Sequence, residues 1–114
     1  MSWINRKLIL DCLKELSSRD EQRRLWLAKA GEVSSFTEVV EQLFTDSGLE
    51  ELLHSRQTDM GSVIEEALLT LENLLSTVDR KLIAAALIDS EPMEKVRASA
   101  MAVLALIDDR KNIQ

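Results

Sequence analysis

The sequence predicts an all-α protein, a single domain of about seven helices over residues 1–114. Apolar residues recur at the three- and four-residue spacing of a helix almost everywhere, and the alternation typical of a strand appears nowhere. Leu, Ala and Glu, which favour helices, are frequent, and β-branched residues are few. Three glycines and one proline exclude a collagen-like or low-complexity chain.

Capping signals divide the chain into helices. Ser18, Ser35 and Ser62 are each followed three residues later by a glutamate, the capping-box spacing that opens a helix. Gly31 and the run Asp46-Ser47-Gly48 are typical of helix ends, and Pro92 is tolerated in a first helical turn. We expect helices over about residues 3–16, 19–30, 36–45, 49–55, 62–77, 79–88 and 91–109.

The last two predicted helices have unusual apolar patterns. Residues 82–88 are apolar on every side, which predicts a helix buried all round at the centre of the fold. The seventh helix has one apolar face of larger side chains and a second face of mostly small ones. We expect the second face to pack on the sixth helix or to form a homodimer seam. It comprises Ala98, Met101, Ala102 and Ala105.

A weak internal repeat relates residues 49–74 to residues 82–107 at a spacing of 33, with Val63 matching Val96 and Leu71 matching Leu104. Residues 82–109 resemble one HEAT or armadillo-type α-hairpin repeat, because a turn with an Asp and a Pro is followed by a Val-Arg pair. Here Asp89, Pro92, Val96 and Arg97 stand in those places. The resemblance implies antiparallel helical hairpins, stacked toward the C-terminus, with an exposed ridge that binds protein.

The formal net charge of −6 is distributed unevenly. Residues 31–79 contain eleven acidic residues and one basic residue, Arg56, whereas residues 1–30 contain more basic than acidic residues. An anionic field of this kind speeds encounter with a cationic partner and repels phosphate backbones. The middle of the chain therefore favours a basic protein partner, and nucleic acid is an unfavourable one.

The residues needed for catalysis or cofactor binding are scarce. His54 is the one histidine, and no motif ties it to Cys12, the one cysteine, which we expect to be a buried hydrophobe. Glu51 and His54 match half of a di-iron Glu-x-x-His pattern, but a second histidine is missing. The glycines are isolated, so no phosphate-binding loop is indicated. We expect no enzymatic activity, no cofactor and no metal.

Compartment and remaining partners follow from similar signals. A lone cysteine requires no oxidising environment, and we find neither a signal-peptide pattern nor about twenty consecutive apolar residues. A cytoplasmic protein without membrane contact is expected. Two alternative functions remain. The first is a homo-oligomeric scaffold or adaptor, and the second, which ranks behind it, is a nucleic-acid-associated regulator that uses the arginines around Trp26 in the second helix.

The sequence thus favours a non-enzymatic protein-binding module, most concretely a small acidic inhibitor or immunity-type protein that neutralises a basic toxin or nuclease. Acidic side chains on the polar sides of the third and fifth helices, with a leucine among them, are the expected contacts. These residues are Glu38, Glu41, Glu65, Glu66, Leu69 and Glu72.

Overall fold

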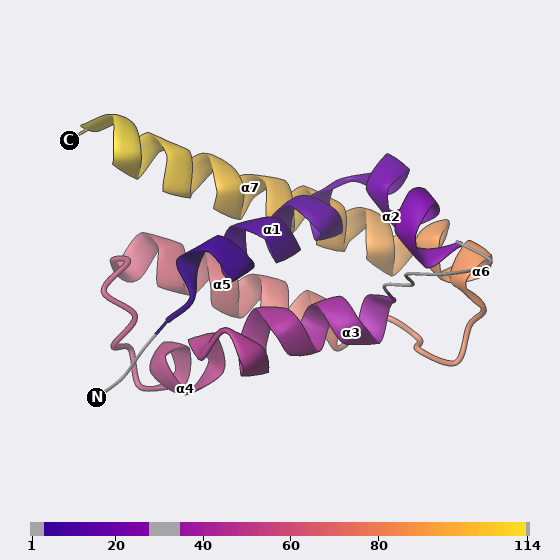
Figure 1. Cartoon of the computed structure of the whole chain (residues 1–114), viewed down its shortest axis with the longest axis horizontal. Helices are drawn as coiled ribbons and strands as arrows, with labels where there is room; N and C mark the ends of the chain where they lie inside the picture. The colour runs from indigo at the N-terminus through magenta and orange to yellow at the C-terminus, as the bar shows by residue number, and fades with distance from the viewer. Residues whose placement is uncertain (1–3, 28–34, 114) are drawn as a thin grey trace.

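The structure is a computed structural model that describes residues 4–27 and 35–113, with side chains described up to residue 109. Every regular element in this part of the chain is helical, which confirms the all-α class (Figure 1). The elements are α1 (Arg6–Ser17), α2 (Arg19–Trp26), α3 (Phe36–Glu41), the π-helical turn η1 (Gln42–Asp46), α4 (Leu49–His54), α5 (Ser62–Leu75), α6 (Ala84–Ile88) and α7 (Glu91–Ile113).

Helix α7 organises the packing. Helices α1 and α5 both pack against it, and α7 runs antiparallel to each of them (Figure 1). Below α1 and α5 lies a layer formed by α3, η1 and α4, on the side away from α7. One hydrophobic core joins these layers, and it includes Leu13, Leu68, Leu71, Val96 and Val103, none of which is exposed. None of the described helices is long and apolar enough to cross a membrane.

Two of the three predicted serine N-caps are confirmed. The Ser18 side chain accepts a hydrogen bond from the amide of Glu21, and Ser35 accepts one from Glu38. Helix α5 differs, because Gly61 is its N-cap and Ser62 is already helical, without a side-chain cap. The second helix ends earlier than the predicted residue 30, because α2 stops at Trp26 and Leu27 is its C-cap. The predicted end at Gly31 lies outside the described residues.

The prediction that residues 82–88 form the central buried helix is wrong. Leu82 is 39% exposed and Ile83 is 75% exposed, and α6 packs against α2 at one end of the molecule (Figure 1). Within α6, Leu87 and Ile88 are the buried residues. Three of its five residues are alanines, which offer little apolar area, so the larger leucines of α5 and α1 occupy the centre instead.

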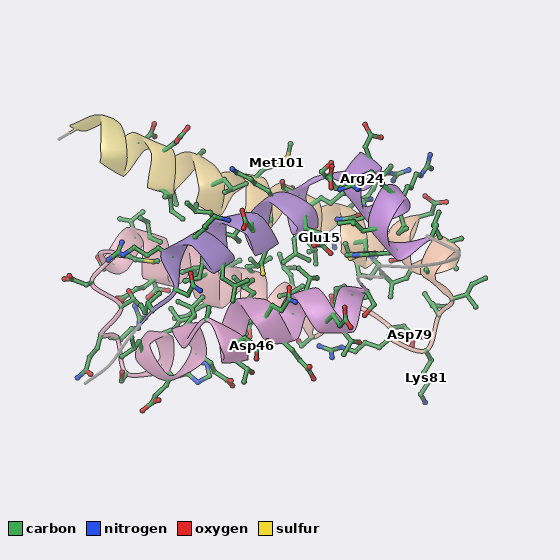
Figure 2. All side chains as sticks on the ribbon, viewed as in Figure 1. Glu15, Arg24, Asp46, Asp79, Lys81 and Met101 are labelled. Carbon is green, nitrogen blue, oxygen red and sulfur yellow. The ribbon has the colours of Figure 1, made fainter. Side chains whose placement is uncertain are left out.

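The two apolar faces of α7 differ in their burial. Met93, Val96, Ala100 and Val103 are buried, as expected of the first face. The second face does not pack on α6, so that expectation is wrong. Its four residues, Ala98, Met101, Ala102 and Ala105, are exposed, and Figure 2 shows Met101 on the outer side of α7.

A buried polar link connects α2 to the ends of α1 and α6. Gln22 is fully buried, and its amide nitrogen donates hydrogen bonds to the carbonyls of Glu15 at 3.1 Å and Leu16 at 2.8 Å. Its amide oxygen accepts from Nη1 of Arg97 at 2.8 Å. Nη1 of Arg97 also donates a hydrogen bond to the carbonyl of Ile88 at 2.9 Å. Gln22 therefore satisfies backbone carbonyls at the end of α1 and pairs with one nitrogen, Nη1, of a guanidinium that is 8% exposed, whereas Nη2 of Arg97 is buried without a hydrogen-bond partner among the described residues.

This link generates a stability prediction. Gln22→Ala should lower the free energy of unfolding by about 1–3 kcal/mol, because it leaves buried polar groups without partners. Urea denaturation followed by circular dichroism measures the change. Arg24→Ala is the control on the same helix, since Arg24 is exposed and pairs with Glu21, and its urea midpoint should stay close to that of the wild type. Equal midpoints for the two variants would contradict the prediction.

Candidate functional site

Four of the six residues predicted as contacts lie on the surface or at its edge. Glu38 and Glu41 are exposed on α3, and Glu66 is exposed on α5. Glu72, on the same helix, has a side chain that is 30% exposed. The other two residues, Glu65 and Leu69, require correction.

Glu65 is a buried structural residue and not a surface contact. It is 6% exposed, and its carboxylate accepts hydrogen bonds from the amide of Thr58 at 3.1 Å and the hydroxyl of Thr58 at 2.6 Å. Those hydrogen bonds hold the pKa of Glu65 below its ordinary value of 4.5. The loop between α4 and α5, which contains Thr58, has left-handed backbone at Arg56 (φ 61°) and Asp59 (φ 67°). Glu65 therefore fastens the α4–α5 loop onto α5 and does not close a capping box.

Leu69 is also misplaced by the sequence prediction. It is half-buried and packs against the hydrophobic core, so it does not stand alone on an acidic surface. The helical period predicts that Leu69 is out of register with the core of α5, but α5 also contacts α4 besides α7, so more than one of its sides is packed.

A groove brings two of the predicted residues together. It lies between the α3–η1 segment and the C-terminal half of α5, beside α4, and has a volume of about 270 Å³. Carboxylates of Glu41, Glu50 and Glu72 line it, with one cation, Arg80, among its described lining residues. The remaining lining residues are Val40, Phe44, Thr45, Leu75 and Ser76. We call this feature the acidic groove.

The floor of the acidic groove is apolar and firmly packed. Phe44 is 6% exposed and Leu75 is 2% exposed, and both belong to the core. At the Arg80 end, the guanidinium lies 5.3 Å from the centre of the Phe36 ring. The groove therefore combines three acidic side chains at the rim with apolar surface between them, which suits a cationic group on an apolar stem.

His54 sets the electrostatics at one edge of the acidic groove. Its Nε2 lies 2.9 Å from Oε1 and 3.1 Å from Oε2 of Glu72. The hydrogen bond and charge of Glu72 raise the pKa of His54 above its ordinary value of 6.5, and Glu50 adds to the effect. When His54 loses its proton, the charge of Glu72 is no longer offset, so the groove becomes more anionic as the pH rises.

Sequence reasoning did not select Glu50 as a contact. A usable signal was present, because Glu50 and His54 are separated by four residues and share one face of α4. The position of α4 beside the end of α5 depends on the turn at Gly48, whose φ of 80° lets the chain reverse after η1. Helical periodicity does not predict the direction that the chain takes after this turn.

Glu66 and Glu38 are not among the described lining residues of the acidic groove. Glu66 forms an ion pair with Arg56, which also lies 3.9 Å from Glu65.

The arginines of the basic helix α2 do not neutralise the acidic groove. Arg19 and Arg23 pair with Asp89 at 3.2 Å and 3.6 Å. These pairs join α2 to the α6–α7 turn.

Cys12 is the buried small residue that the sequence predicts. It is 2% exposed, and burial, with nearby carboxylates, raises the pKa of its thiol to about 12. Its sulfur lies 3.9 Å from Oε1 of Gln42 in η1. Among the described residues, no group of three or more His, Cys, Asp or Glu side chains is arranged to hold a metal ion.

A family model described as a domain of unknown function (DUF7945) matches residues 1–112. The chain belongs to the DUF7945 family. No curated protein and no solved structure matches it significantly. The DUF7945 match includes every residue that lines the acidic groove. The resemblance of residues 82–109 to an α-hairpin repeat stays a prediction.

The buried carboxylate generates a prediction about acid stability. A group with a lowered folded-state pKa stabilises the protein above its unfolded pKa, here about 4.5, and this contribution is lost as the pH falls through the lowered value. Glu65→Gln should therefore be less stable than the wild type at neutral pH, and the difference should shrink at about pH 3. Urea denaturation at both pH values measures it. An equal loss of stability at the two pH values would contradict the prediction.

The His54–Glu72 pair generates a second pH prediction. Because the pKa of His54 is raised, its contribution to stability is complete below 6.5 and is lost as the pH rises through the raised value. Nuclear magnetic resonance titration of the ring protons measures this pKa directly, since the chain has one histidine. Glu72→Gln should lower it more than Glu50→Gln does. A pKa that is unchanged in Glu72→Gln would contradict the geometry of the pair.

Proposed function

We propose that this chain is a non-enzymatic module that binds a basic protein in the acidic groove. Its most concrete form is a small acidic inhibitor or immunity-type protein that neutralises a basic toxin or nuclease by covering its active site. One observation carries the proposal: Glu41, Glu50 and Glu72 converge from three helical segments around the apolar floor made by Phe44 and Leu75.

The physical chemistry of the groove supports a protein partner. Acidic side chains steer a cationic surface toward the groove and raise the association rate, while the apolar floor contributes affinity once water is displaced. The packed floor fixes the helices that carry the three glutamates before binding, so little backbone ordering entropy is lost. A phosphate backbone, by contrast, is repelled by the same three carboxylates.

The test substitutes Glu41 and Glu50, because both groove residues are exposed. We expect Glu41→Lys/Glu50→Lys to abolish capture of a basic protein from host extract, because it replaces two of the three groove carboxylates with cations. Asp11→Lys/Asp20→Lys, on exposed positions of α1 and α2, changes the net charge equally away from the groove. Quantitative mass spectrometry compares the proteins retained by the wild type and by both variants.

The captured protein then provides the decisive measurement. Its own activity should be suppressed by an equimolar amount of the wild-type chain, and its association rate should fall at least about tenfold for the groove variant. Retention of the same proteins by all three baits would show that the groove is not the binding site. Capture without suppression would exclude an inhibitor.

A further inference from the structure

The outer face of α7 carries a regular stripe of exposed residues. Lys95, Ala98, Ala102, Ala105 and Asp109 follow one another at spacings of three and four residues, and all five are exposed. This spacing repeats every seven residues, which is the period of a seam between two helices. The central part is apolar, a charged residue stands at each end, and no described residue forms an ion pair with either charge.

Apolar hollows flank this stripe on both sides. One, of about 320 Å³, lies between α1 and α7 and is lined by Leu10, Lys14, Leu104, Ala105, Ile107 and Asp108. The other, of about 350 Å³, lies between the start of α5 and α7 and is lined by Met60, Gly61, Ser62, Val63, Ile64, Leu106 and Asp109. Two large apolar side chains are exposed in this region, Met101 at 58% and Val63 at 65%. A ridge between two hollows is the surface that a second helix ridge fills.

The distribution of charge along the stripe selects a second copy of this chain as the occupant. Lys95 and Asp109 each lie seven residues from Ala102, on opposite sides of it. A two-fold axis beside Ala102 would place Lys95 of each copy next to Asp109 of the other in an antiparallel pair. The stripe is therefore complementary to itself, as a two-fold interface requires. An unrelated partner would not require this symmetry.

The side chains suit the same arrangement. Alanines at the middle of the stripe let two helix backbones approach closely. Met101 lies on the side of α7 that faces the α1–α7 hollow. In an antiparallel pair it would reach the level of residues 103–105 of the other copy, and so enter that copy's α1–α7 hollow. The flexible methionine side chain fills such irregular hollows well.

We propose that the outer face of α7 is the interface of an antiparallel homodimer. The acidic groove lies between α5 and the layer of α3, η1 and α4, and that layer is on the side of α1 and α5 away from α7 (Figure 1). Met101 marks the outer face in Figure 2. None of the described residues that line the groove is on α7, so a dimer formed through α7 leaves both grooves open. The proposal does not rest on the function proposed for the groove.

Sedimentation velocity on the full chain tests the proposal. From about 1 to about 300 µM, the mass should rise from 12.9 kDa toward twice that value. Ala102→Glu should weaken association at least about tenfold, because it places like charges face to face across the axis. Ala86→Glu is the matched control, since Ala86 is an exposed alanine on α6. Circular dichroism shows that each variant is folded.

A charge exchange distinguishes this interface from any other. Lys95→Asp and Asp109→Lys should each weaken association about tenfold, and the double variant should return to within about threefold of the wild type. Failure of that rescue would overturn the antiparallel arrangement. A mass of 12.9 kDa at every concentration would overturn the dimer itself, as would equal effects of Ala86→Glu and Ala102→Glu.

Discussion

Helix α7 can be buried only if two other helices share its apolar face, and this constraint organises the rest of the structure. A single helix would not cover this face, because it extends beyond the stripe of buried larger side chains to residues that are half-buried against the core. The stripe comprises Met93, Val96, Ala100 and Val103, and the half-buried residues are Leu104, Leu106 and Ile107. Helices α1 and α5 cover it from two sides and run antiparallel to α7. Their own remaining apolar residues then require a third layer, which α3, η1 and α4 supply.

The third layer contributes core residues from η1. Leu43 and Phe44 are adjacent in this π-helical turn, and both are buried. The chain then reverses at Gly48, after Ser47 has accepted a backbone hydrogen bond from Asn5 at 2.9 Å. Two consequences follow: Phe44 forms part of the floor of the acidic groove, and α4 brings Glu50 and His54 to its rim.

Charged and polar groups are divided between two roles. Glu65, Gln22 and Arg97 are buried, and each holds backbone of another segment in place. The exposed acidic residues remain at the surface, where their field extends into solvent. Because the acidic groove lies between α5 and the α3–η1–α4 layer and has no described lining residue on α7, occupation of one proposed interface does not cover the other. Such separation would allow a dimer to engage two partners at once.

Local chemistry along the chain was sufficient to predict the helical class, the caps at Ser18 and Ser35, and the burial of Cys12. Those features depend on neighbours a few residues away, which the sequence specifies directly. The exposure of α6, the burial of Glu65 and the meeting of Glu41 with Glu50 and Glu72 depend on how helices pack. Helical periodicity shows which side of a helix is apolar, but packing competition between distant helices decides whether that side finds a partner. For that reason the acidic composition was evident from the residues alone, whereas the groove exists only in the folded chain.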